Sequence, residues 1–192
     1  MSYSHIGGDS RASFPELESL FQTIESIMGF LPNSLLIMSK KPELMKAFQT
    51  LAGVVFSSKH LKSDLIQLIA LASSLSSGCK YCQAHTSHGA STAGVSEEKI
   101  NGILKYQESD YFNETEKAAL DLAFASGTTP NQTEKKHFEE LEKYFSKEAI
   151  IDIVSVISLF GWLNRWNDTF GTTVEDVPKK FVEQKLSPLG WE

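Results

Sequence analysis

The amino-acid sequence predicts an all-α fold, and three features of it support that prediction. Capping residues and prolines precede segments whose apolar residues repeat at helical spacing. No alternating strand pattern is flanked by hairpin turns, and no low-complexity linker divides the chain. With 192 residues, of which 41% are apolar, the chain is long enough to bury one core. We therefore predict a single all-α domain over residues 1–192.

Three helical segments are predicted before the cysteines. The sequence SFPE at 13–16 combines a capping serine, an early proline and a glutamate, and apolar residues follow at helical spacing until Gly29. A short segment at 35–39 precedes Pro42, which can begin the second helix. Residues 64–76 are apolar on nearly every side, which is typical of a helix buried among other helices.

The next helix is predicted to begin at Gly78 or Cys79 and to stop around Gly94. Ser96 can cap a short helix, and the sequence NETE at 113–116 is a capping box that starts another. Helical punctuation therefore continues past the middle of the chain.

The last part of the chain combines amphipathic and apolar segments. Residues 133–145 alternate apolar and charged positions at helical spacing, and residues 146–170 predict one long, strongly apolar helix that ends at Gly171. We expect a short helix after Pro178 and a packed Trp191 near the end of the chain.

Composition excludes several classes of function. The formal charge of −6, from 18 Lys and Arg against 24 Asp and Glu, opposes non-specific attraction to nucleic acid or anionic lipid. The longest apolar stretches fall short of the roughly 20 apolar residues that span a bilayer. The first residues lack the charged start and apolar centre of a secretory signal, so we expect a cytoplasmic protein.

The stretch GCKYCQAHTSHGA at 78–90 holds both cysteines and two of the five histidines. Cys79 and Cys82 are three residues apart, so on a helix they share one face. The N-terminus of a helix favours a thiolate, which is the nucleophilic form of cysteine. His85 and His88 continue the row at the same spacing, and either imidazole can exchange protons near neutral pH.

Two other interpretations of this stretch remain open. The cysteines can be buried apolar residues beside two surface histidines that have no chemical role. Alternatively, the spacing C-x2-C-x2-H-x2-H offers four familiar zinc ligands, although one straight helix cannot surround a single ion. In a reducing compartment a structural disulfide is the least expected use of a CxxC pair.

At these residues the sequence resembles a known family. GCKYCQAHT, preceded by LIQLIALASSLSS, is similar to the carboxymuconolactone decarboxylase/alkylhydroperoxidase D (AhpD)-like superfamily, and in particular to its peroxidase-related members. The resemblance continues through KPELMKAF upstream and through LFGWLNRWNDTFGT and the closing LGW downstream. It implies an AhpD-like helical bundle that is oligomeric, a trimer or hexamer, and that reduces hydroperoxides with its CxxC pair.

The resemblance also implies roles for particular residues. Cys82 matches the cysteine that attacks the peroxide and Cys79 the one that resolves it, while a dithiol reductant or carrier protein restores the pair without haem, flavin or metal. The family histidine falls on Thr86, so His85 stands one residue earlier. The family's relay glutamate falls on Gln67, and glutamine cannot take a proton.

Other groups could supply the missing proton acceptor. Asp64 lies one turn before the glutamine position, although it also suits a helix cap. Asp168 is a second carboxylate, although it also suits a surface ion pair with Arg165. Proton transfer could otherwise use His85, His88 and water alone.

The polar cluster NRWND at 164–168 follows the apolar stretch 150–162. It indicates either a hydrogen-bonded site or an oligomer contact. If the cluster is functional, Trp162, Trp166 and Asn167 could wall the cysteine site. Apolar residues predicted to be exposed suggest contacts with further copies of the chain, and they lie around Phe30, Leu36, Met38 and Phe48.

We therefore predict a thiol-dependent hydroperoxide reductase in which Cys79, Cys82 and His85 are catalytic. One alternative is an enzyme of the carboxymuconolactone decarboxylase type, whose chemistry does not need two thiols. Another is a helical oligomer without catalytic activity, or a redox sensor whose disulfide changes a partner contact.

Overall fold

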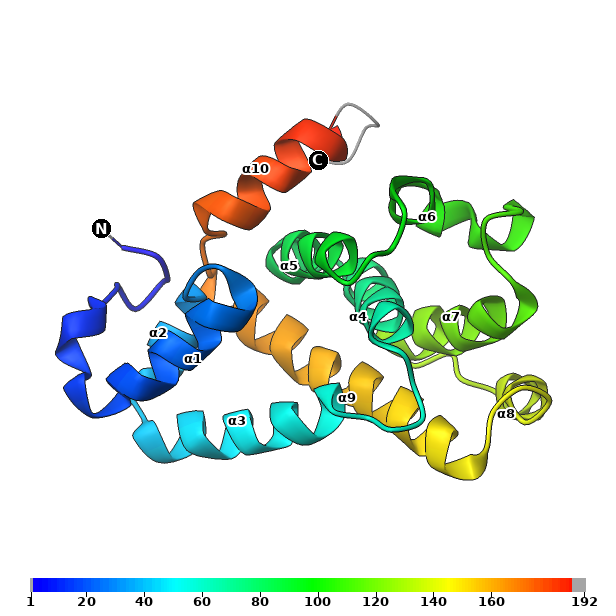
Figure 1. The fold of residues 1–192 in the computed structure, drawn as a ribbon, viewed down its shortest axis with the longest axis horizontal. Coiled ribbons are helices and arrows are strands. Elements are labelled where there is room, and N and C mark those ends of the chain that lie inside the picture. Colours follow the sequence, from blue (N-terminus) through cyan, green and yellow to red (C-terminus); the bar gives the residue numbers. More distant parts are fainter. Residues whose placement is uncertain (1, 188–192) are drawn as a thin grey trace.

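The computed structural model describes residues 2–187, and every regular element in that range is a helix. The prediction of an all-α fold is confirmed (Figure 1). The α-helices are α1 (Glu18–Met28), α2 (Asn33–Ser39), α3 (Pro42–Phe56), α4 (Ser63–Ser77), α5 (Lys80–Thr92), α6 (Glu97–Gly102), α7 (Glu114–Gly127), α8 (Lys135–Leu141), α9 (Lys147–Phe170) and α10 (Asp176–Lys185). Short 3-10 turns occupy Arg11–Ser13, Pro15–Leu17 and Ile103–Glu108.

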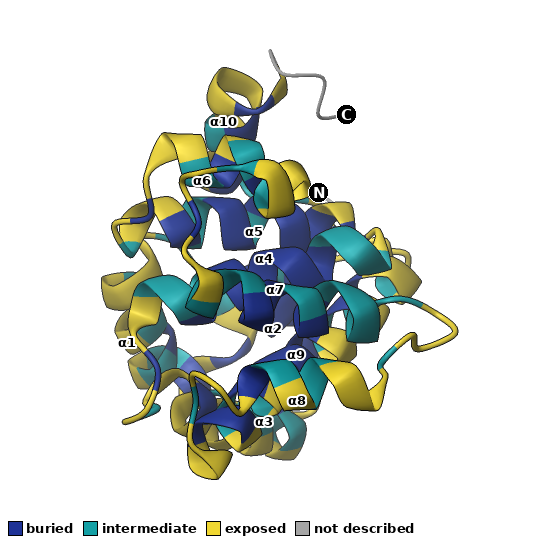
Figure 2. Ribbon diagram, turned by 90° about the vertical axis from the view of Figure 1, so that its right-hand side faces the viewer, coloured by how far each residue is buried: buried dark blue, intermediate teal, exposed yellow. Residues whose placement is uncertain are grey.

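Helix α4 is the centre of the bundle. It packs against α5, α7 and α9, while α10 covers α5 and α3 lies along α9. Buried residues concentrate in these central helices, as the dark ribbon segments of Figure 2 show. The fully buried Leu68, Ile69 and Leu71 explain why the sequence of α4 is apolar on nearly every side.

Most helix ends follow the predicted caps. Ser96 accepts the backbone N–H of Lys99, and Asn113 forms a capping box with Glu116. Gly171, with φ of 56°, ends α9 in the left-handed conformation that glycine adopts most easily.

Three predicted boundaries are wrong. Helix α1 follows a 3-10 turn, and the hydroxyl of Ser13 caps neither element. Helix α8 is shorter than the predicted 133–145 segment. Helix α10 begins two residues before Pro178, because the first turn of a helix tolerates proline. The predicted packing of Trp191, with the closing LGW, lies outside the described residues.

Helix α9 differs from the expectation that no segment could span a membrane. Among residues 2–187 it is the one helix whose length and mean hydropathy of 1.3 meet that criterion. Its apolar residues Ile153, Val156 and Leu159 are buried against the bundle, and the core helix of a soluble protein passes the same test.

The predicted exposed apolar face around Leu36 and Met38 is also wrong. These side chains are 9% and 0% exposed, because α2 packs them into a cluster with Phe21 and Met45. Several exposed apolar residues lie on α3 and α9, namely Leu51, Val54, Ile151, Val154 and Trp162, while others, such as Ile27 and Leu104, lie elsewhere on the surface.

Gly78 joins α4 to the cysteine helix with φ of 80°. We expect Gly78→Ala to lower the free energy of unfolding by about 1–2 kcal/mol, because a side chain is strained in the left-handed region. Urea unfolding measures this change. Gly53→Ala is the control, since Gly53 is helical with open space around it and should gain about 0.5–1 kcal/mol. Equal effects at the two sites would show that the turn at Gly78 is not strained.

Candidate active site

The two cysteines meet at the N-terminus of α5. After the turn at Gly78, Cys79 takes the N-cap position and its Sγ accepts the backbone N–H of Cys82 at 3.4 Å. Sulfur here replaces the side-chain oxygen that usually caps a helix. Both cysteines are free thiols. The structure therefore places the predicted pair in one helical turn.

Both cysteines of this turn are buried. Cys79 is 0% and Cys82 is 3% exposed, because Leu163 and Val174 pack over them. Burial raises the pKa of the Cys82 thiol well above its usual range, and the hydrogen bond and negative charge of Cys79 raise it further. The Cys82 thiol is therefore protonated in most molecules at neutral pH.

Asn167 of α9 donates a hydrogen bond to one of the two sulfur atoms. Its Nδ2 donates to Cys82 Sγ at 3.5 Å and to the Leu163 carbonyl at 2.9 Å. This contact opposes the effect of burial by lowering the pKa of Cys82. Of the three residues suggested to line the cysteine site, Asn167 does contact Cys82. Trp162 stacks on Trp166 and on Phe48 instead, so these rings face α3.

His85 is held by a carboxylate that the sequence analysis missed. Its Nε2 lies 2.5 Å from Glu175 Oε2, and both side chains are 11% exposed. The His85 ring also stacks on Tyr81, with centroids 4.2 Å apart. In residues 2–187 no hydrogen bond joins His85 to either sulfur, so the imidazole borders the dithiol without binding it.

Glu175 connects three elements through one carboxylate. Besides His85, it accepts the Tyr81 hydroxyl at 2.8 Å and the backbone N–H of Asn33. Burial, followed by the negative charge of Glu175, raises the pKa of Tyr81 well above its usual range, so Tyr81 remains a donor. Glu175 is the N-cap residue of α10, yet its side chain caps nothing in that helix. The only sequence signal was an acidic residue shortly before Pro178.

The carboxylates proposed from the sequence lie elsewhere. Asp64 is not the predicted helix cap: the N-cap of α4 is Lys62, and Asp64 lies in the first turn, where it accepts the N–H of Leu65 at 2.7 Å. Asp168 is exposed, and its charge only adds to the raised pKa of Cys82. The expected ion pair between Asp168 and Arg165 is not found among residues 2–187.

Gln67 and His88 lie further along the α4–α5 pair. The amide oxygen of Gln67 sits so close to Gly89 that a Cβ there would be 2.6 Å away, and no hydrogen bond to a cysteine or histidine is found for it in the described range. His88 packs edge-on against Phe30 and Phe181. Burial, then the nearby His85, lowers the pKa of His88, so it is mostly neutral at pH 7.

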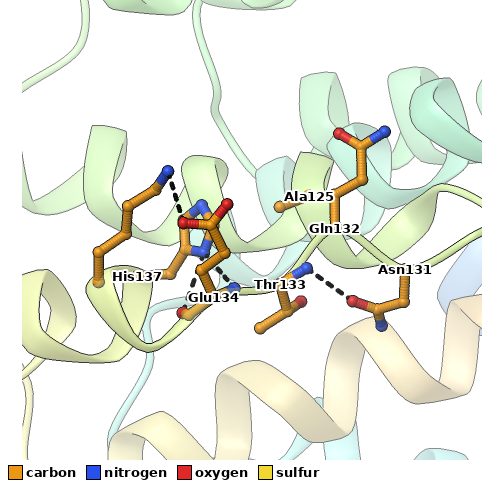
Figure 3. Close-up of a pocket in the computed structure, with 7 residues that line it drawn as sticks. Ala125, Asn131, Gln132, Thr133, Glu134 and His137 are labelled. Carbon is orange, nitrogen blue, oxygen red and sulfur yellow. Dashed lines mark hydrogen bonds and ion pairs between the residues drawn. The ribbon is translucent and has the colours of Figure 1, made fainter.

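Neither of two surface depressions found on the described residues has a cysteine in its lining. One depression of about 480 Å³ lies between α7 and α8, and Figure 3 shows Asn131, Glu134 and His137 lining it. A smaller one, of about 250 Å³, lies beside the first turn of α5. Val174 lines it and also packs against the cysteines, so this side chain separates the depression from the dithiol.

Within residues 2–187, no group of three or more His, Cys, Asp or Glu side chains could hold a metal ion. The zinc interpretation of the CxxC stretch therefore has no ligand set in this part of the chain.

Comparison with known proteins identifies the family. A model of the carboxymuconolactone decarboxylase family matches residues 42–125. The debrominase Bmp8, crystallised as its C82A variant in complex with 2,3,4-tribromopyrrole, is 39% identical, covers 92% of this chain and 95% of its own, and superposes with a TM-score of 0.86. This chain belongs to the carboxymuconolactone decarboxylase/AhpD-like superfamily.

More distant relatives agree with this membership. A peroxidase-related protein with an AhpD core from Ralstonia eutropha JMP134 shares the fold, with 22% identity, a TM-score of 0.82, and coverage of 95% of this chain and 96% of its own. The uncharacterized protein YdfG of Bacillus subtilis (strain 168) is 28% identical over 103 residues, which is 53% of this chain and 67% of that protein.

Two residues of this AhpD-like chain, Thr86 and Gln67, differ from those expected at the family's histidine and glutamate positions. Thr86, at the expected histidine position, donates its hydroxyl to the Cys82 carbonyl at 2.7 Å and so serves the helix backbone. Gln67, at the expected glutamate position, is uncharged. An imidazole and a carboxylate are nevertheless present as the pair His85 and Glu175.

The contact between Asn167 and Cys82 predicts a pH dependence. Because the pKa of Cys82 is raised, its thiolate fraction is small at pH 7 and grows as the pH increases. We expect Asn167→Leu to move the midpoint of Cys82 alkylation by iodoacetamide to still higher pH and to slow alkylation several-fold at pH 7. Fragment-resolved mass spectrometry measures this at Cys82 alone. The exposed Asn101 supplies the control Asn101→Leu, and identical profiles for the two variants would contradict the role of Asn167.

Proposed function

We propose that this protein is a thiol-dependent oxidoreductase that reduces hydroperoxides by cycling Cys79 and Cys82 between dithiol and disulfide. The observation that supports the proposal most is the sharing of one helical turn by two free thiols, with Cys79 Sγ on the Cys82 amide and Asn167 on Cys82 Sγ. Membership of the AhpD-like superfamily agrees with this chemistry.

In the first step Cys82 acts as the nucleophile. Its proton passes through water to the His85 imidazole, which lies one turn further along α5. The Cys82 thiolate attacks the terminal oxygen of the hydroperoxide, the O–O bond breaks, and the sulfur is oxidised to a sulfenic acid. The alkoxide that leaves takes a proton and becomes an alcohol.

His85, one turn after Cys82 on α5, is suited to deliver that proton. Glu175 orients the imidazole through Nε2, as a carboxylate does for a general acid or base. The Tyr81 hydroxyl and the Asn33 amide fix the carboxylate in turn. The pair of His85 and Glu175 thus takes the part expected of the family histidine and glutamate.

In the second step Cys79 resolves the intermediate. Its sulfur attacks the Cys82 sulfenic acid, the S–O bond breaks, and hydroxide leaves as water while the disulfide forms. The sum is the oxidation of one dithiol and the reduction of one hydroperoxide to alcohol and water. An external dithiol or carrier protein must then reduce the disulfide, and no metal or organic cofactor takes part.

Reductive debromination is a second candidate, favoured by the 39% identity to the debrominase Bmp8. The same two thiols balance that reaction. Cys82 takes bromine from carbon, the carbanion is protonated, and Cys79 displaces bromide as the disulfide forms. Because both reactions end in one disulfide, the substrate that sustains turnover distinguishes them.

We also propose that the chain forms a homo-oligomer through α3 and α9. These helices pack side by side and expose Leu51 (53%), Val54 (71%) and Ile151 (65%). Exposed apolar groups of this kind are typical of protein contacts.

Single-cysteine variants test the thiol cycle. We expect Cys82→Ser to abolish stoichiometric consumption of tert-butyl hydroperoxide, and Cys79→Ser to consume one equivalent and stop at a sulfenic acid that dimedone traps. The parent protein should lose two hydrogens in intact-mass spectra and turn over repeatedly with excess dithiol. Unimpaired consumption by both variants would refute the assignment, and one oxidation without turnover would indicate a redox sensor. The parallel assay with 2,3,4-tribromopyrrole and release of bromide tests the second candidate.

Glu175→Gln tests the carboxylate. The amide keeps the size and can still accept the Tyr81 hydroxyl, but it removes the negative charge beside the His85 ring. We expect kcat to fall about tenfold or more, since positioned acid–base groups contribute at least that much. Glu183→Gln, on the exposed side of α10, is the control. If both variants keep full activity, Glu175 has only a structural role.

A further inference from the structure

Two buried asparagines of α9 leave their side-chain oxygens without partners. Asn164 is 3% and Asn167 is 2% exposed, and they are three positions apart, so they lie on the same face of the helix. Asn164 Nδ2 donates to the Ser73 carbonyl at 3.4 Å, and Asn167 Nδ2 donates to Cys82 Sγ and the Leu163 carbonyl. The Oδ1 atom of each residue has no hydrogen-bond partner among the described residues.

Such an arrangement is costly for a protein core. A buried amide oxygen without a donor loses its hydration and gains nothing in return, and native proteins contain few of them. Here two occur within one turn of one helix. They also lie on the face that contacts Cys82, where each amide nitrogen is already used.

We propose that the side-chain oxygens of Asn164 and Asn167 form an acceptor site that binds an N–H or O–H group of the substrate beside Cys82. This inference rests on the proposed function and narrows its substrate class. The substrate carries a polar hydrogen on the atom that the sulfur attacks, as a hydroperoxide does, or close to it, as an N–H heteroaromatic does. Compounds in which that hydrogen is replaced by an alkyl group are poor ligands.

The two asparagines divide the work. Asn167 acts on the sulfur through its nitrogen and on the substrate through its oxygen, so its replacement changes both. In the described part of the chain Asn164 makes no hydrogen bond to a sulfur, and its Nδ2 donates to the Ser73 carbonyl of α4. Asn164 is therefore the position where substrate binding can be altered without changing Cys82.

The test compares Asn164→Leu with the parent protein and with Ser74→Ala. Ser74 is equally buried on α4, but its hydroxyl already donates to the Ala70 carbonyl, so it controls for the loss of a buried polar group. Two readouts are used: KM and kcat for tert-butyl hydroperoxide, and binding of 2,3,4-tribromopyrrole and its N-methyl derivative in a Cys82→Ala background.

Asn164→Leu should raise KM about tenfold at unchanged kcat, or remove an approximately tenfold preference for the N–H pyrrole, as expected for one lost hydrogen bond. The pH midpoint of Cys82 alkylation should not move. Asn164→Asp, which keeps an acceptor oxygen, should lie closer to the parent and guards against misfolding of the leucine variant.

The proposal is overturned if neither readout responds to Asn164→Leu, if Ser74→Ala responds equally, or if the alkylation midpoint shifts. Failure of the proposed function has a different signature. The parent protein would then show no dithiol turnover with hydroperoxide or bromopyrrole, before any asparagine variant is compared.

Discussion

The hydrogen bond from the Cys82 amide to the Cys79 sulfur is the interaction on which the site depends. It makes Cys79 the cap of α5, so both sulfurs are fixed in the turn that begins the helix. The same position buries them under Leu163 and Val174. A buried thiol resists ionisation, so the site needs groups that stabilise a thiolate on Cys82. The Asn167 amide donates a hydrogen bond to Cys82 Sγ, and the N-terminus of α5 contributes its positive end.

The carboxylate that contacts His85 comes from the start of α10, an element that the sequence did not suggest. Helix α5 carries no acidic residue in its first turn, and the α4 position expected to carry a glutamate is Gln67. Glu175 compensates because the connection between α9 and α10 returns the chain to α5, next to Tyr81 and His85. An N-cap carboxylate normally binds its own helix, but this one binds its neighbours instead.

The comparison of sequence with structure follows from this geometry. Local signals predicted the helices well, because caps such as Asn113 and the left-handed Gly171 act within a few residues. The CxxC spacing likewise placed Cys79 and Cys82 together. Burial of the pair and the role of Glu175 could not be predicted, since the latter depends on a contact between residues 90 positions apart. Asp64 and Asp168 were plausible from spacing alone, yet a carboxylate serves His85 only if tertiary packing brings it there.

The segment between α9 and α10 carries both a side chain that covers the sulfurs and the carboxylate that holds His85. Val174 packs on the cysteines and borders the depression beside α5, while the adjacent Glu175 holds His85. Because the two residues are consecutive, a movement of Val174 that exposes the sulfurs also strains the contact between Glu175 and His85. A small substrate such as a hydroperoxide needs less displacement of Val174 than a larger ring does. The side chain that covers the sulfurs and the carboxylate that holds the imidazole are therefore carried by one short stretch of backbone.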